Sequence, residues 1–345
     1  MSVLVLGGKG TNFNHFVVAG TTAAVPFKFG PSGPLVGPPG PCTGKMTRAA
    51  VKINVPNLGE IKDISSADRL TMAPVAAAMR EDGRLIVAGI HSSINGVHPD
   101  HHLVVLDGAN GLVLEGMRPV LCDIDDPVVA IDAERGLVYV IGNRCRKRKA
   151  FVYDVNTGEL VKLPPNTEYE TALADGHAVV FSDGTLLVFG GRTLARGASG
   201  VKSADYTPSA SAAAYDPRSR EWRTVAGNAP TIERAAFALL LDVLYVFCGD
   251  EQGYECWALE RIGDEWKWAV LPRSPSVRHQ GSAVLAGGRI IVHGGYPFNG
   301  TCDTFDPVEQ GWLQPEKQLE PESECGTFGG LARCNAASVW VPGLE

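Results

Sequence analysis

Four histidines and an aspartate gather within one short stretch of the chain. His91, His98, His101 and His102 are half of the protein's eight histidines, and Asp100 lies among them. Imidazole and carboxylate groups are suitable zinc ligands, so these residues are candidate metal ligands. Their spacing nevertheless predicts a loop, with no helix or strand pair to fix the geometry. A polar loop is therefore the favoured interpretation, and no cofactor is predicted.

A second stretch is strongly basic although the net charge of the chain is −7. Residues 143–149 contain Arg144, Arg146, Lys147, Arg148 and Lys149. Such a run can bind an acidic partner or a nucleic-acid backbone, and it is also typical of a solvated loop. Because the whole chain is acidic, general nucleic-acid binding is not expected. An acidic segment of a protein partner is the functional prediction for this run.

Three arginines stand where predicted strands begin. Their guanidinium groups would lie at one end of a central channel and could bind carboxylates or phosphates. The three residues are Arg234, Arg278 and Arg333. Pairing with acidic neighbours such as Glu233 is the equally weighted alternative. Arg192, two residues beyond Gly190, is a further partner-binding candidate.

The elements that would position these side chains form an internal repeat. Six times a predicted apolar strand ends at a glycine. After a stretch of variable length, an apolar residue is followed by Asp, or by Asn or Glu in the same position. The glycines are Gly7, Gly89, Gly142, Gly190, Gly249 and Gly294, and the paired positions are Asn54, Asp107, Asp154, Asp216, Glu260 and Asp306. Six residues further on stand Glu60, Val113, Leu160, Trp222, Trp266 and Trp312. A fixed offset repeated this often predicts a repeat architecture.

Each repeat reads as a four-stranded antiparallel unit. Between 177 and 222, two apolar strands flank a turn at Asp183-Gly184, and a third strand leads through a turn at Asp216-Pro217 to a fourth that carries Trp222. No long segment has a 3.6-residue apolar period, so an all-β fold is predicted.

These units resemble kelch repeats. The resemblance is carried by LLVFGG with YDPRSREW, IIVHGG with FDPVEQGW, and LYVFCG with ALERIGDEW. Three repeats lack the second glycine, and Val113 and Leu160 replace the tryptophan in two of them. The resemblance implies a β-propeller and, as the family's usual role, a disc that binds protein partners.

The ends of the chain predict how the propeller closes. Residues 2–6 look like a second strand without a first, and residues 336–341 look like a first strand without a second. Pairing them would remove two exposed edges. We therefore expect a six-bladed propeller that occupies residues 1–345 as a single domain, with residues 9–48 as a Pro/Gly-rich insertion in the first blade. A seventh blade made from 9–48 is the alternative.

Insertions concentrate on one side of this fold. The gap from glycine to paired position varies from 11 to 47 residues, whereas the other turns stay short. Second-to-third-strand loops emerge together with the connections between blades, on what we call the long-loop face; the turns lie on the short-turn face. Loops carry function, so the long-loop face is the predicted binding face. Residues 28–45 belong to this face and contain Pro-x-x-Pro spacing. They are interpreted either as a polyproline ligand or as a surface insertion without a binding role.

Composition limits the cellular setting. No stretch approaches the ~20 apolar residues of a membrane span, and the N-terminus lacks the apolar core of a signal peptide. The eight cysteines form no CxxC pair, which favours free thiols in a reducing, cytoplasmic or other intracellular compartment. Disulfides such as Cys248–Cys256 or Cys325–Cys334 are the alternative.

The sequence favours a non-enzymatic scaffold or adaptor over an enzyme. It contains no GxSxG, GxxxxGK[ST] or HExxH motif. No Tyr-His dipeptide occurs and no histidine follows His293, which argues against a copper-radical oxidase of the galactose oxidase kind. A sugar-acting enzyme that resembles sialic-acid mutarotases stays as the alternative function, and it would use Arg234, Arg278 and His279 in the channel.

Overall fold

The structure is a computed structural model of the chain. It describes residues 2–6, 9–10, 15–20, 25–28, 72–81, 85–93, 100–108, 121–122, 125–144, 147–165, 173–174, 176–194, 206–225, 229–249, 253–263, 265–286, 288–295, 302–313, 333–334 and 337–341.

Four sheets between residues 125 and 313 follow the predicted repeat unit. In each sheet the strands follow one another in space as they do in the chain. The first two sheets are β9 (Asp125–Asp132), β10 (Leu137–Arg144), β11 (Lys147–Asp154) and β12 (Leu160–Lys162), and β14 (His177–Val180), β15 (Leu186–Phe189), β18 (Ala212–Asp216) and β19 (Glu221–Thr224). The other two are β20 (Ala236–Leu240), β21 (Val243–Phe247), β22 (Cys256–Ile262) and β23 (Glu265–Leu271), and β24 (Ser282–Ala286), β25 (Arg289–His293), β26 (Cys302–Asp306) and β27 (Gly311–Trp312). All neighbouring strands are antiparallel.

Further sheets come from the rest of the described residues. One contains β5 (Met72–Met79), β6 (Leu85–Ser93), β7 (Asp100–Gly108) and β8 (Leu121–Cys122), and another contains β29 (Ala337–Val341), β1 (Ser2–Leu6), β3 (His15–Gly20) and β4 (Val25–Lys28). Two small sheets pair β2 (Lys9–Gly10) with β28 (Arg333–Cys334), and β16 (Arg192–Leu194) with β13 (Leu173–Ala174) and β17 (Tyr206–Pro208).

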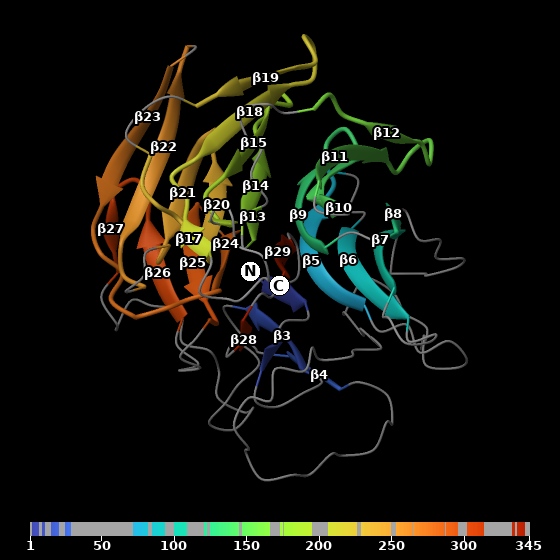
Figure 1. Cartoon of the computed structure of the whole chain (residues 1–345). Helices are drawn as coiled ribbons and strands as arrows, with labels where there is room; N and C mark the ends of the chain where they lie inside the picture. Colours follow the sequence, from blue (N-terminus) through green and yellow to red (C-terminus); the bar gives the residue numbers. More distant parts are fainter. Residues whose placement is uncertain are drawn as a thin grey trace.

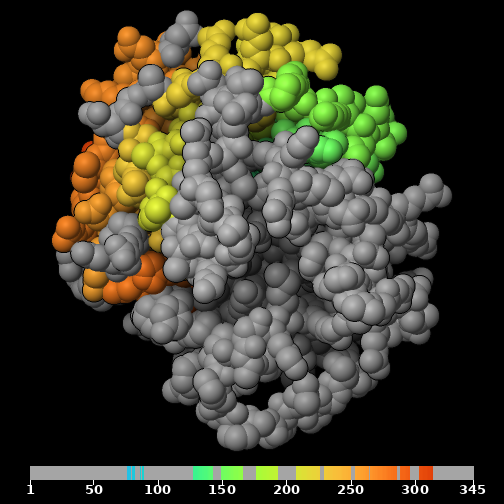
Figure 2. Space-filling view, viewed as in Figure 1, coloured from blue at the N-terminus to red at the C-terminus, as the bar shows by residue number. Residues whose placement is uncertain are grey.

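The four-stranded sheets stand around a common centre, with β1 and β29 close to it, so the fold is an all-β propeller (Figure 1). In the same view the residues coloured yellow to orange lie together on the upper left of the surface (Figure 2). No helix in the described part of the chain is long and apolar enough to cross a membrane.

The core lies between the blades, where sheets pack face to face. Phe189 and Leu187 of one blade meet Val246 and Trp257 of the next, all nearly fully buried. The following interface contains Phe247, Phe305 and Trp312, whose rings pack edge to face at centroid distances of 5.3 to 5.4 Å. Apolar residues of each blade are therefore buried by the neighbouring blade, as a repeat architecture requires.

The structure explains the constant part of the repeat. Asp216 Oδ1 accepts the backbone N–H of Arg218 at 2.8 Å and closes the third-to-fourth-strand turn, and Asp154 and Asp306 accept equivalent bonds. Six residues after Asp216, the indole of Trp222 donates to the Pro164 carbonyl of the preceding blade at 3.0 Å. Trp312 donates to Pro272 in the same way. The offset thus joins a turn to a link between blades.

Glycine pairs end strands because the backbone turns left-handed there. Gly190 and Gly191 have φ of 64° and 83°, and a Cβ on Gly190 would lie 2.4 Å from the carbonyl oxygen of Ile232. Where the second glycine is missing, the strand does not stop: β10 continues through Gly142 to Arg144, and β6 through Gly89 to Ser93. At Gly249 the preceding residue, Cys248, takes the left-handed conformation instead, with φ of 59°.

The first predicted repeat differs from the structure. The strand next to β1 is β3, within residues 9–48, and not the segment before Asn54. β1 pairs with the nearest apolar run, HFVVAG, and not with the run that precedes an Asp-like residue. The assignment of residues 1–345 to one domain stays a prediction, and residues 29–71, including Asn54 and most of 28–45, lie outside the described residues.

Candidate functional site

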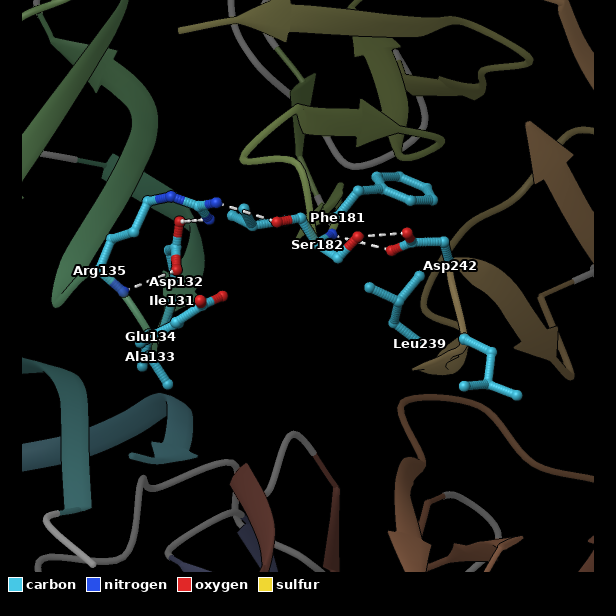
Figure 3. A pocket seen from close by; sticks show the side chains of 11 residues that line it. Ile131, Asp132, Ala133, Glu134, Arg135, Phe181, Ser182, Leu239 and Asp242 are labelled. Carbon is cyan, nitrogen blue, oxygen red and sulfur yellow. Dashed lines mark hydrogen bonds and ion pairs between the residues drawn. The ribbon is translucent and has the colours of Figure 1, made fainter. Parts of the chain in front are cut away.

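A cavity of about 530 Å³ opens on the short-turn face, where the first strands of three blades end (Figure 3). Its lining comes from the β9–β10, β14–β15 and β20–β21 hairpins: Ile131, Asp132, Ala133, Glu134, Arg135, Val180, Phe181, Ser182, Leu239, Leu241 and Asp242. Leu241 is 90% exposed, although an apolar side chain gains by burial. The lining thus combines apolar side chains with the charged side chains of Asp132, Glu134, Arg135 and Asp242.

Side chains at this rim tie the three blades together. The Arg135 guanidinium binds Asp132 at 2.9 Å and donates to the Ser182 carbonyl of the next blade at 3.0 Å. The Ser182 backbone N–H donates to Asp242 Oδ1 at 2.8 Å, and the Ser182 hydroxyl donates to Asp242 Oδ2 (Figure 3). The hydrogen bond to Asp132 raises the pKa of Arg135. The dashed contacts in Figure 3 form a continuous chain from blade to blade.

Two further links extend this bracing. Arg261 binds Asp183 at 2.6 Å and the Thr185 hydroxyl at 3.1 Å, although its own strand belongs to the following blade. Arg80 donates to Asn156, which donates to the Arg135 carbonyl at 3.1 Å. Asp132 and Asp242 are therefore engaged within the fold. The Ser182 hydroxyl and backbone N–H both donate to the Asp242 carboxylate of the following blade, so this pair links two blades.

On the long-loop face, the basic run lies on paired strands. The sequence predicted a loop, but β10 and β11 stay in register as far as Gly142↔Lys149, Asn143↔Arg148 and Arg144↔Lys147. Only residues 145 and 146, between the two strands, lie outside the described residues. The backbone therefore carries the basic run as the end of a hairpin.

The predicted arginines do not share one environment. Arg192, at the start of β16, forms an ion pair with Glu233 at 3.2 Å. Arg234 lies at the entrance to β20 with φ of 53°, and its carbonyl accepts the Gln280 N–H at 2.7 Å. Arg333 pairs through its backbone with Gly10. Pairing with an acidic neighbour such as Glu233 was the predicted alternative for the three first-strand arginines, and the residue that pairs with Glu233 is Arg192.

Arg278 is fully buried, in contrast to the exposed acceptor that the sequence suggested. Its guanidinium binds Asp303 at 2.5 Å and donates to the Gly294 carbonyl at 2.8 Å. The imidazole of His293 is buried nearby, and burial together with the charge of Arg278 lowers the pKa of His293 to about 3. This cluster joins the connection before β24 to β25 and β26, and it stabilises the blade from inside.

The histidine cluster also differs from the predicted loop. His91 lies on β6, and Asp100, His101 and His102 lie on β7, with His91 directly opposite His102. The strands are longer than expected because β6 continues past Gly89. His98 lies outside the described residues. Among the side chains that the structure describes, no group of three or more His, Cys, Asp or Glu residues is placed to hold a metal ion.

Sequence reasoning missed the short-turn cavity, because its contacts join residues from different repeats. Ser182 and Asp242 are 60 residues apart, and Arg135 and Ser182 are 47 apart. One signal was present. The β20–β21 turn is Leu241-Asp242, with φ of 48° and 60°, where the other first-to-second-strand turns use glycine. A non-glycine pair in the left-handed region marks a position worth noting.

Comparison with known proteins adds one relative. No model of a known protein family matches the chain. A curated protein of Arabidopsis thaliana, named as an F-box/kelch-repeat protein, is 30% identical over 172 residues. The match covers 47% of this chain and 46% of the relative, so the chain spans about half the length of the curated relative it matches. The kelch motifs predicted from the sequence occupy the four-stranded blades described above.

The chain is a β-propeller whose repeats resemble those of kelch proteins. Two solved structures are similar to this propeller over most of its length. A fungal alcohol oxidase of the AA5 family, in complex with copper, has a TM-score of 0.42 and 16% identity, and covers 72% of this chain and 65% of its own. A structure of YjhT has a TM-score of 0.43 and 17% identity, and covers 66% of this chain and 74% of its own. At these scores and identities, neither structure bears on the function of the propeller.

Proposed function

We propose that this propeller is a non-enzymatic scaffold or adaptor that binds a protein partner on its long-loop face. The Arabidopsis relative supports a role in protein interaction, because it is an F-box/kelch-repeat protein by name. Fold does not fix function, so the proposal needs a site as well.

The β10–β11 hairpin supplies the observation that carries the proposal. Its register keeps Arg144, Lys147, Arg148 and Lys149 on paired strands beyond Gly142, where a blade with a glycine pair would have ended. A paired hairpin loses less conformational entropy on binding than a free loop does. A partner with an acidic segment would complement these charges and associate faster at low salt. Arg146 completes the run between the strands.

The test compares charge reversals at the two faces. We expect Arg146→Glu/Arg148→Glu to lose the partner that the wild-type protein captures in affinity purification followed by quantitative mass spectrometry. The matched control is Arg218→Glu/Arg223→Glu, which reverses two exposed charges at the short-turn end of a blade and should retain the partner. If the hairpin variant retains every wild-type partner, the long-loop face is not the binding face.

The sugar-acting alternative depends on Arg234, Arg278 and His279. The buried ion pair of Arg278 with Asp303 leaves that guanidinium no open face for a sugar, and no described contact favours the alternative. An NMR measurement of anomer exchange tests it directly, and exchange that is lost in Arg278→Ala in a variant that still folds would favour the enzyme.

We also propose that the propeller has six blades and closes where β29 pairs with β1. First strands pack against one another in the order β20, β24, β29, β5, β9 and β14, which supports a ring of six. Leu4 lies opposite Val339. We expect Leu4→Cys/Val339→Cys to form a disulfide in the folded protein. Leu4→Cys/Ser338→Cys should not, because neighbouring strand residues point to opposite sides. Equal cross-linking of both pairs would contradict the closure.

A further inference from the structure

Two buried thiols lie side by side at the long-loop end of one blade. Cys248 follows β21, Cys256 begins β22, and both are free and at most 1% exposed. The chain between them is tied by a hydrogen bond from the Cys248 N–H to the Glu255 carbonyl at 2.9 Å. Neither thiol belongs to the proposed binding hairpin or to the short-turn cavity.

The backbone brings the two sulfur atoms within reach of each other. Phe247 is directly opposite Cys256, so the Cα atom of Cys248 lies about 6 Å from that of Cys256, within the range of disulfides. In a regular strand the Cys248 side chain would point to the other side of the sheet. Its φ of 59° breaks that alternation, and the two thiols lie close enough for each to shift the pKa of the other.

The surroundings make the two thiols unequal. The neighbouring Cys256 thiol lowers the pKa of Cys248, and Ser274 and the charge of Arg278 act in the same direction. The neighbouring Cys248 thiol and burial raise the pKa of Cys256. A thiolate is the reactive form of cysteine, so Cys248 is the attacking sulfur and Cys256 the resolving one.

We propose that Cys248 and Cys256 are a reversible dithiol that hydrogen peroxide converts to a disulfide. The Cys248 thiolate attacks one peroxide oxygen, the O–O bond breaks, and the leaving hydroxide takes a proton to become water. This leaves a sulfenic acid on Cys248. The Cys256 sulfur then attacks it, the S–O bond breaks, and a second water leaves with the Cys256 proton. Two thiols are oxidised by two electrons, and one peroxide is reduced to two waters.

Burial slows this reaction but does not prevent it. Tyr254, whose carbonyl accepts from the Cys256 thiol at 3.4 Å, is 37% exposed, and Pro275 beside Ser274 is exposed. Residues next to the thiols are therefore themselves exposed to solvent, and a local opening of the chain there admits a molecule the size of peroxide. The resulting bond would join the ends of β21 and β22 at the long-loop face.

The chain offers a clean mass-spectrometric test. Trypsin releases residues 235–261 as one peptide that contains both cysteines and no other. The folded protein is exposed to hydrogen peroxide, alkylated and digested. We expect this peptide to be unalkylated and lighter by two hydrogen masses, and dithiothreitol treatment before alkylation should restore both thiols.

Two variants and an unfolded control separate the proposal from chance oxidation. In Cys256→Ser, dimedone should trap a sulfenic acid on Cys248, whereas Cys248→Ser should leave Cys256 unlabelled. The proposal is overturned if the peptide keeps two alkylatable thiols while the protein is folded, if the disulfide forms only in urea, or if both variants label equally. The wild-type peptide decides the matter even if either variant fails to fold.

Discussion

The two ends of the blades hold their neighbours by different means. On the short-turn face, partly exposed side chains bridge from turn to turn: Arg135 to Ser182, Ser182 to Asp242, and Arg261 to Asp183. On the long-loop face, the chain entering a blade packs against left-handed glycines and a fully buried guanidinium. Burial makes each contact of the second kind costly to break, whereas exposed contacts are individually weak.

This difference separates the tasks of the two faces. Buried links at the base of the long loops let the connections above them vary in length while the blades stay fixed. On the short-turn face, several exposed contacts together keep neighbouring blades fixed. Substitutions of single residues should therefore have large effects at the long-loop end and small effects at the short-turn end.

The largest loss is expected from Arg278→Met. Removing the guanidinium leaves Asp303 buried without its ion-pair partner, which costs about 3–5 kcal/mol of unfolding free energy. Urea unfolding measures it. The double substitution Arg278→Met/Asp303→Leu should cost less than Arg278→Met alone, because no uncompensated charge stays buried. If the single variant unfolds like the wild type, this ion pair does not hold the blade.

The second largest loss of unfolding free energy, about 3 kcal/mol, is expected from Gly190→Ala. The substitution combines a left-handed φ with a clash against the Ile232 carbonyl. The matched control is Gly263→Ala, which has the same φ of 64° but no atom within 4 Å of the new Cβ. The control should lose only about 1 kcal/mol. Equal losses in thermal or urea unfolding would mean that close packing contributes nothing at Gly190.

Between pH 6.5 and about 3, His293 should make the protein less stable as the pH falls. Its folded pKa of about 3 lies below the ordinary 6.5, so the unfolded chain binds a proton that the folded chain refuses. The stability is complete above pH 6.5 and falls by up to about 1.4 kcal/mol per pH unit below it. Urea unfolding at pH 7 and pH 5 should show the loss, and His293→Gln should reduce it. A slope unchanged in that variant assigns the acid sensitivity to other groups.

Local features of the blades could be predicted from the sequence, whereas contacts between blades could not. Hairpins such as that at Asp183-Gly184 and the Asp216-to-Trp222 offset were readable, because turn chemistry and alternation are local. The extension of β10 past Gly142 was not, since a lone glycine was taken to end the strand and β10 continues through it. Contacts across blades, including Ser182 with Asp242 and Arg278 with Asp303, join residues that no spacing rule relates. The repeat and its turns were therefore predictable, but the surroundings of Arg278 and the cavity were not.

The smallest effect is expected from Arg261→Ala on the short-turn face. Arg261 and Asp183 are 29% and 40% exposed, so solvent screens the ion pair and its loss costs about 0.5 kcal/mol. The guanidinium also lies 5.5 Å from the Trp266 ring centroid, a contact that adds little at an exposed site. Raising the salt concentration should shrink the difference from wild type in urea unfolding, whereas the loss in Arg278→Met should persist because that pair is buried. A loss above about 2 kcal/mol, or one insensitive to salt, would show that the two faces are braced alike.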